Sequence, residues 1–125
     1  MVIDSDIIIK HLRSKDKTNT KFTFAALKYK LHTTVISEFE IYVGAMTQKQ
    51  IHSADQLFRL VNILDLNAGC GKEAGQMLMK FRKQGKQVDW RDTLIAGICI
   101  YHSLPLLSDN VKHFEKFEKL KLIHI

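Results

Sequence analysis

The chain has 125 residues, of which 46% are hydrophobic and 26% charged, and it carries a formal net charge of +6 at pH 7. This length and composition are typical of one globular domain with a hydrophobic core, and they exclude a disordered chain. No apolar run is long enough to cross a membrane, and acidic residues at positions 4 and 6 stand where a signal peptide needs basic ones. We therefore expect a cytoplasmic protein with no membrane partner, whose excess of positive charge favours a polyanion such as nucleic acid.

The two cysteines, Cys70 and Cys99, are far apart in the sequence, and each lies among apolar or small residues. We expect buried thiols rather than a disulfide or a metal-binding pair, which fits a reducing compartment. The six histidines show no metal-ligand spacing, so ordinary polar or surface contacts are expected for them.

Apolar residues at strand and helix spacing predict short strands that alternate with helices. In chain order, the expected elements are a strand at 1–3, helices at 5–13 and about 20–30, a strand at 31–35, helices at 37–46 and about 48–60, a strand at 61–66, helices at 68 to about 84 and at 90–102, a strand at 105–107, a helix at 110–117 and a strand at 120–125. Ser5 or Asp6 is expected to cap the first helix, Ser37 the third, and Asn67 and Asp89 the fifth and sixth.

This alternation predicts a three-layer α/β/α domain over residues 1–125 with a largely parallel central sheet. In such sheets, ligands bind at the carboxyl ends of the strands. Asp4 follows the first predicted strand, and Asp109 and Asn110 follow the strand at 105–107. These residues are therefore candidates for a functional site.

Four short segments place acidic or amide side chains on an apolar background. They are Asp4-Ser5-Asp6, Ser37 to Gly44 with Glu40 inside it, Asp89 to Gly97 with Asp92 inside it, and Leu106 to Val111 with Asp109-Asn110 inside it. A carboxylate among apolar residues is costly to bury unless a basic side chain or a metal ion compensates its charge.

Each segment also has an explanation that involves no function. Asp4 could accept hydrogen bonds from a helix start or pair with a lysine, and Glu40 could be a surface residue. Asp92 could be an ordinary acid in the first turn of a helix. Asp109 and Asn110 could form a turn and a helix cap.

In their order and spacing, the four segments resemble the motifs of the PIN-domain family, specifically the small ribonuclease toxins of VapBC toxin–antitoxin pairs. The motif D-[TS]-[NSD] after a hydrophobic strand matches Asp4-Ser5-Asp6, and [TS]-x-x-E-[LIF]-x-x-G matches Ser37 to Gly44. The second match selects Glu40 over Glu38. The motif D-x-x-I-A matches Asp92 to Ala96, and [TS]-x-[ND]-x-x-x-F matches Ser108 to Phe114, with Asn110 at the acidic or amide position.

The resemblance implies a PIN-like domain that is a metal-dependent endoribonuclease with Mg²⁺ or Mn²⁺ as cofactor. It implies Asp4, Glu40 and Asp92 as metal ligands, since a divalent cation relieves the repulsion between clustered carboxylates. Whether Asp109 or Asn110 completes the catalytic set is left open by the fourth motif. Ser5, Asp6 and Asn110 are expected to support these metal ligands without binding the metal ion themselves.

The same resemblance implies an RNA substrate, a cognate antitoxin protein and a homodimer. Three basic residues lie close to the predicted site in the sequence and are candidates to contact the RNA backbone, although a solvated basic helix end is an equal explanation. They are Lys83, Lys86 and Arg91.

Two other functions are compatible with a sheet of this kind. A non-catalytic PIN-like module that binds RNA or protein would keep the fold, and the asparagine at position 110 leaves it open. A phosphatase or a receiver-like phospho-acceptor is disfavoured, because a receiver needs its acceptor aspartate well inside the chain and gives Glu40 no role.

Overall fold

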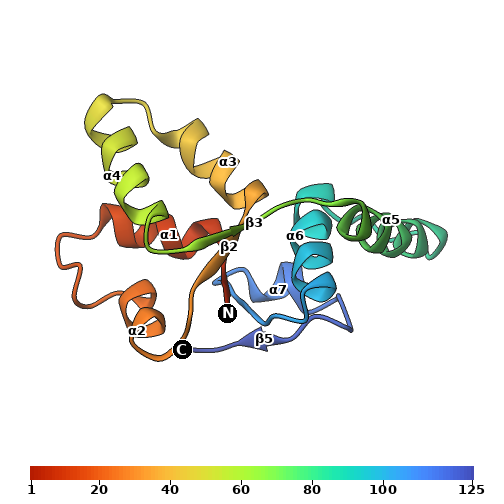
Figure 1. The fold of residues 1–125 in the computed structure, drawn as a ribbon. Helices are drawn as coiled ribbons and strands as arrows, with labels where there is room; N and C mark the ends of the chain where they lie inside the picture. The colour runs from red at the N-terminus through yellow and green to blue at the C-terminus, as the bar shows by residue number, and fades with distance from the viewer.

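A parallel sheet of five short strands, in the order β3-β2-β1-β4-β5, forms the centre of the protein. The structure is a computed structural model that describes residues 1–125 (Figure 1). Every pair of neighbouring strands is parallel. The strands are β1 (Val2–Ile3), β2 (His32–Thr34), β3 (Asn62–Leu64), β4 (Leu106–Leu107) and β5 (Leu122–Ile123).

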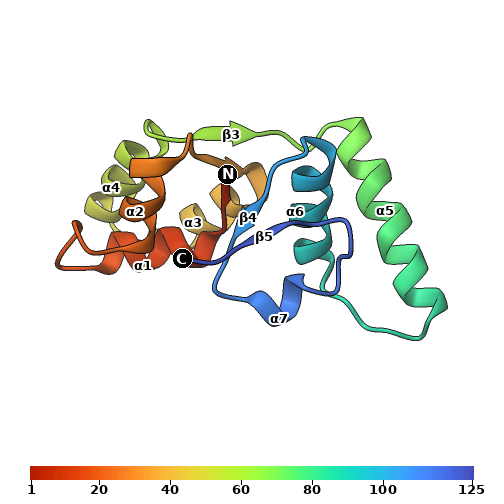
Figure 2. The same cartoon turned by 90° about the horizontal axis from the view of Figure 1, so that it is seen from below.

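Seven helices cover the two faces of this sheet. They are α1 (Ser5–Arg13), α2 (Lys21–Lys28), α3 (Val35–Gly44), α4 (Gln48–Phe58), α5 (Ala68–Lys83), α6 (Trp90–Tyr101) and α7 (Val111–Phe114). Figure 2 shows α1 to α4 on one side of the strands and α5 to α7 on the other. The predicted three-layer α/β/α architecture with a parallel sheet is therefore confirmed.

Each face of the sheet has its own hydrophobic core, because successive side chains of a strand point to opposite faces. Ile3 and Leu107 pack into the core beneath α1 to α4. Val2 and Leu106, one residue earlier in the same two strands, pack into the core beneath α5 to α7. Strands buried on both faces read as continuous apolar runs, which is why these short segments were recognisable in the sequence.

The pairing of β1 with β4 positions the site. Val2 is opposite Leu106 and Ile3 is opposite Leu107, so the two strands end together. The backbone N–H of Asp4 continues the ladder by donating to the Leu107 carbonyl oxygen at 3.0 Å. Residues that follow β1 and residues that follow β4 therefore lie side by side, although about a hundred positions separate them.

Two predicted helix caps are wrong, and in both cases the cap comes from the end of the preceding strand. Asp4, not Ser5 or Asp6, caps α1: its Oδ1 accepts from the Ser5 N–H at 2.9 Å. Thr34, not Ser37, caps α3: its Oγ1 accepts from the Ser37 N–H at 3.1 Å. Strand and helix thus follow each other without a loop.

The caps predicted for the two helices on the other face are confirmed. Asn67 Oδ1 accepts from the Cys70 N–H at 3.0 Å, and Asp89 Oδ1 accepts from the Arg91 N–H at 2.7 Å. The helix expected at 110–117 is shorter than predicted, since α7 ends at Phe114. None of the seven helices combines the length and apolar composition that crossing a bilayer requires.

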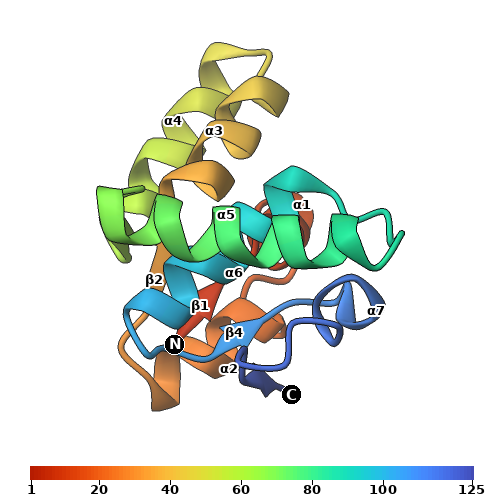
Figure 3. The same ribbon diagram turned by 90° about the vertical axis from the view of Figure 1, so that its right-hand side faces the viewer.

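Helices α5 and α6 pack at very close range through Gly97, and Figure 3 shows α5 lying across α6. A Cβ atom at position 97 would lie 2.8 Å from the Ala74 Cβ and 3.1 Å from the Cys70 carbonyl oxygen. We expect Gly97→Ala to lower the free energy of unfolding by about 1–3 kcal/mol, because an overpacked core must shift to make room.

The matched control is Gly75→Ala on α5, where nothing lies within 4 Å of the added atom. This change should raise stability by up to about 1 kcal/mol, since alanine favours the helix over glycine. Urea unfolding of both variants measures the difference, and equal stability of the two would contradict the close packing.

Candidate acidic site

Asp4 is the buried centre of the site. It lies at the carboxyl end of the central strand β1 and is only 4% exposed. Its Oδ1 accepts from the Ser5 N–H at 2.9 Å, and its Oδ2 accepts from the Ser108 hydroxyl at 2.7 Å. No lysine, arginine or histidine forms an ion pair with it.

Burial raises the pKa of Asp4 to about 7 from an ordinary value of 3.8. The hydrogen bonds from Ser108 and Ser5 lower this pKa, and the negative charges of Asp6 and Glu40 raise it further. Desolvation and like charge therefore outweigh the two hydrogen bonds, and the ionised form of Asp4 is under-compensated.

Ser108 is a residue of the site that the sequence analysis did not single out. Its side chain is buried, and besides Asp4 it lies 3.4 Å from Asp6 Oδ2. It occupies the [TS] position of the fourth matched motif, which was the available signal. Its role follows from a contact between residues 104 positions apart, which no local pattern reveals.

Glu40 lies on α3 and Asp92 on α6, and both residues are half-buried. Burial is the main cause that raises the pKa of each. Asp92 also raises the pKa of Glu40, and Glu40 raises that of Asp4. The three predicted metal ligands thus come from three different parts of the chain, and like charge couples Glu40 to Asp4 and Asp92 to Glu40.

Neighbouring side chains partly offset this repulsion. Arg91 and then Ser5 lower the pKa of Glu40. His113 on α7 lies with its Nδ1 at 3.3 Å from Asp92 Oδ2 and lowers the pKa of that acid. The expectation of an ordinary polar contact for His113 did not foresee a partner in the site, because the contact joins two separate helices.

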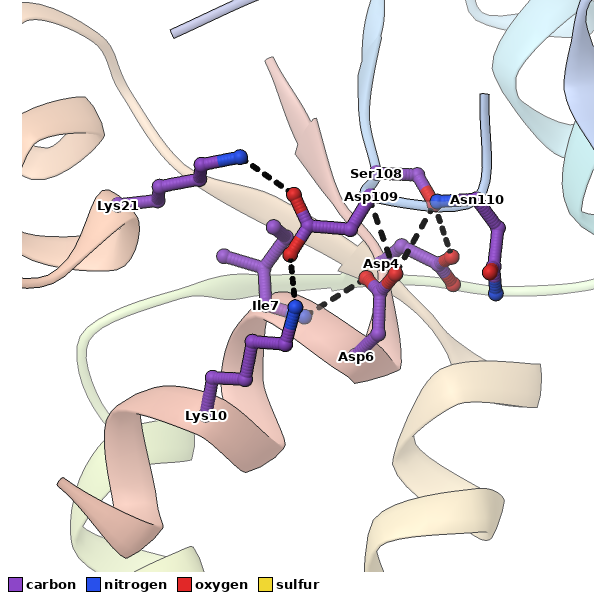
Figure 4. A network of polar contacts seen from close by, with 8 residues as sticks. All are labelled: Asp4, Asp6, Ile7, Lys10, Lys21, Ser108, Asp109 and Asn110. Atoms are coloured by element: carbon purple, nitrogen blue, oxygen red, sulfur yellow. Dashed lines mark hydrogen bonds and ion pairs between the residues drawn. The ribbon is translucent and has the colours of Figure 1, made fainter. Parts of the chain in front are cut away.

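Asp109 points towards two lysines and away from Asp4, as Figure 4 shows, whereas Asp6 shares the Ser108 hydroxyl with Asp4. The two carboxylate oxygens of Asp109 form ion pairs with Lys10 and Lys21, and these contacts hold its pKa below the ordinary value. Asp6 accepts from the N–H groups of Ile7 at 2.7 Å and Asp109 at 3.0 Å. The catalytic role expected for Asp109 stays a prediction, and its charge is already compensated by two lysines.

Asn110 is exposed at the start of α7. Its side chain makes no capping hydrogen bond, while its backbone N–H donates to the Ser108 hydroxyl at 3.0 Å. Asn110 therefore supports the site through its backbone, by helping to orient the serine that contacts Asp4. The supporting role expected for its side chain stays a prediction.

The basic residues expected to contact RNA occupy two different places. Arg91 is exposed near Glu40, with its guanidinium 5.7 Å from the centre of the Trp90 ring. Lys83 ends α5 and Lys86 follows in the loop to α6, both exposed, and Figure 2 shows this loop at the outer end of the molecule beyond α6. Only Arg91 of the three adjoins the acids.

The chemistry of Asp4, Glu40 and Asp92 fits a hard divalent cation, which prefers carboxylate oxygens and would relieve their mutual repulsion. The geometry is less complete. No group of three or more His, Cys, Asp or Glu side chains lies close enough together to hold a metal ion. Glu40 is coupled by like charge to Asp4 and to Asp92, but the three side chains do not form a finished coordination shell.

Comparison with known proteins adds the family. Residues 1–120 match the sequence profile of the family described as PIN domain. The chain is 32% identical over 97 residues to Ribonuclease VapC3 of Methanocaldococcus jannaschii, a match over 78% of this chain and 95% of that protein. It is 27% identical over 121 residues to Ribonuclease VapC10 of Mycobacterium tuberculosis, a match over 97% of this chain and 90% of that protein.

Two solved structures have a similar fold. One is VapBC2 from Rickettsia felis bound to a DNA fragment from their promoter, with a TM-score of 0.85, 19% identity and coverage of 98% of this chain and 96% of that chain. The other is VapBC-1 from nontypeable Haemophilus influenzae, with a TM-score of 0.84, 23% identity and coverage of 98% and 95%.

The raised pKa of Asp4 predicts how stability depends on pH. Because the folded protein binds this proton more tightly than the unfolded chain, Asp4 favours folding below about pH 4 and progressively opposes it as the pH rises through 7. In Asp4→Asn that loss disappears, and the amide can still accept from Ser5 and donate to Ser108. Without divalent cations, the variant should gain up to about 4 kcal/mol over wild type between pH 4 and pH 8.

Thermal unfolding of the two proteins in EDTA across this pH range measures the effect. Comparison at each pH removes the contributions of the other titrating groups. A stability difference that stays constant from pH 4 to pH 8 would contradict an under-compensated Asp4.

Proposed function

Since the chain belongs to the PIN domain family, we propose that it is a metal-dependent endoribonuclease that hydrolyses RNA phosphodiester bonds. The observation that carries this proposal is the set of three carboxylates formed by Asp4, Glu40 and Asp92, each with a raised pKa and none with a lysine or arginine ion pair. Such a set favours a divalent cation as its missing counter-charge. The VapC relatives named as ribonucleases support the choice of RNA.

Asp4, Glu40 and Asp92 would hold Mg²⁺ or Mn²⁺. When bound, the cation supplies positive charge against the phosphate and generates a nucleophile from water at neutral pH. Ser108 and the Ser5 N–H fix the Asp4 carboxylate in place. Arg91, beside Glu40, supplies a guanidinium that can contact a phosphate oxygen.

The net charge of +6 supports a polyanionic substrate. Lys83 and Lys86 are kept as proposed RNA contacts, at a greater distance from the acids than Arg91. Both are exposed and form no ion pair. We assign them a general electrostatic attraction for the RNA backbone rather than a role in the reaction.

We further propose that the protein is the toxin of a toxin–antitoxin pair, with a cognate antitoxin partner and a homodimeric state, acting in the cytoplasm. The VapC and VapBC relatives support this setting. Phe39 and Val43, one turn apart on α3, are 64% and 67% exposed, and Met46 just beyond is 87% exposed. Apolar side chains gathered in this way favour a protein partner. The free, buried Cys70 and Cys99 agree with a reducing compartment.

A second candidate is a PIN-like module that binds RNA or protein without cleaving it. The incomplete grouping of the metal-ligating side chains favours it. Incubation of the purified protein with single-stranded RNA and Mg²⁺ or Mn²⁺, followed by gel electrophoresis, separates the two. Cleavage supports the nuclease, and intact RNA that stays bound supports the binding module.

The two glutamates of α3 give a matched test of the acidic site. Glu40 is coupled to the acids around Asp4, whereas Glu38 acts on Tyr42 instead. We expect Glu40→Gln to lower the cleavage rate by a factor of about 100 or more, as expected for loss of an essential electrostatic contact. Glu38→Gln should cleave at the wild-type rate. Equal rates for the two variants in a fluorescent RNA cleavage assay would refute the assignment.

Metal removal is the second test. Excess EDTA should abolish RNA cleavage, and added Mn²⁺ should restore it. Mn²⁺ should also raise the melting temperature of wild type by several degrees, since a ligand at about 100 times its Kd stabilises by about 2.7 kcal/mol. Asp4→Asn should lose this rise. Full cleavage activity in EDTA would exclude the metal-dependent mechanism.

A further inference from the structure

Next to the acidic site lies a second charged group, made of Lys10, Lys21 and Asp109. Lys10 comes from α1 and Lys21 is the first residue of α2. Each ammonium group pairs with a different carboxylate oxygen of Asp109 (Figure 4). Together with Ser14, Asn19 and Thr20 they line a cavity of about 390 Å³.

The exposure of these side chains shows which charges face outward. The side chain of Asp109 is 20% exposed, whereas those of Lys10 and Lys21 are 68% and 44% exposed. The acid therefore lies beneath two ammonium groups that would repel each other without it. Two positive charges against one negative leave a net charge of +1, and each ammonium retains hydrogen-bond donors that Asp109 does not use.

The loop after β4 joins this cluster to the acidic site. Ser108 donates to Asp4, and the next residue, Asp109, donates its N–H to Asp6 Oδ2 at 3.0 Å. Lys10 follows Asp6 by one helical turn on α1. One dipeptide thus fixes both the buried acid and the position of the lysine pair at the same end of the sheet.

We propose that Lys10 and Lys21, held together by Asp109, bind a phosphodiester group of the RNA strand beside the acidic site. A phosphodiester carries one negative charge shared by two oxygens, as the Asp109 carboxylate does, and suits paired cationic donors. The cavity wall of hydroxyl and amide groups fits a polar ligand better than an apolar side chain. Asp109 is then a positioning residue for the lysines. The inference rests on the proposed function, which brings an RNA strand to the neighbouring acids.

The test measures binding of a fluorescent single-stranded RNA to the full chain by anisotropy, in EDTA so that no cleavage occurs. The variants are Lys10→Gln and Lys21→Gln, with Lys28→Gln as the control, since Lys28 is an exposed lysine at the other end of α2 with no ion pair. Each variant of the pair should raise the Kd roughly 3- to 10-fold and make the slope of log K against log salt shallower by about 0.7. The control should bind as wild type does.

Asp109→Asn separates positioning from net charge. If Asp109 only added negative charge, its neutralisation would tighten RNA binding. If Asp109 holds the lysines together, the asparagine variant binds RNA more weakly than wild type at the same salt concentration. Thermal melts of each variant confirm that the fold is intact.

Several outcomes overturn the inference. The first is RNA binding by the Lys10 and Lys21 variants that equals binding by Lys28→Gln, and the second is tighter RNA binding by Asp109→Asn than by wild type. The third is a loss of binding to a labelled polyglutamate peptide in the Lys10 and Lys21 variants as large as their loss of RNA binding, which would indicate an acidic protein partner. A separate cleavage assay with Mg²⁺ distinguishes the two hypotheses. RNA binding that depends on the lysines, without cleavage, would contradict the nuclease and support the phosphate site. Cleavage together with RNA binding that does not depend on the lysines would support the nuclease and contradict the phosphate site.

Discussion

The buried carboxylate of Asp4 is the constraint around which the other site residues are arranged. It follows the central strand directly, caps α1 through the Ser5 N–H and receives the Ser108 hydroxyl from the neighbouring strand's loop. The same side chain therefore ends a strand, starts a helix and ties two distant parts of the chain together. Its structural contacts are hydrogen bonds only, so its charge is left without a counter-ion, and that deficit is what makes the site suited to a cation.

This arrangement sets stability against function. Glu40 on α3 adds negative charge near Asp4, and Asp92 on α6 adds negative charge near Glu40. Each of these charges makes the ionised form of its neighbour less favourable. The fold tolerates the repulsion because the two hydrophobic cores hold these helices to the sheet independently of the acids. The strain is confined to side chains at one end of the sheet, where a ligand can relieve it.

The layer architecture, the parallel sheet and the approximate helices were predictable from the sequence, because apolar periodicity and strand–helix alternation are local signals. The cap of α3 was not predictable, since Thr34 belongs to a strand in a local interpretation and becomes a cap only where strand meets helix without a loop. For α1, the helix-start contact considered for Asp4 is the one that the structure shows. Motif order pointed to Asp4, Glu40 and Asp92. The partners that tune them could not be found in this way: Ser108 and His113 reach the acids through contacts that exist only after the sheet and helices have assembled.

The pair Ser108-Asp109 shows why motif positions alone are insufficient to assign the acidic residues of the site. The matched pattern gave Asp109 and Asn110 as alternatives for the last acidic position, and both were judged by their proximity in sequence to the same strand end. In the fold, the residue that contacts Asp4 is the serine before them, and Asp109 instead joins α1 to α2 through Lys10 and Lys21. A carboxylate already paired with two ammonium groups has its charge compensated, whereas the charge of Asp4 has no ion-pair partner. The charge balance of each acid therefore separates Asp109 from Asp4, which their places in the motifs do not do.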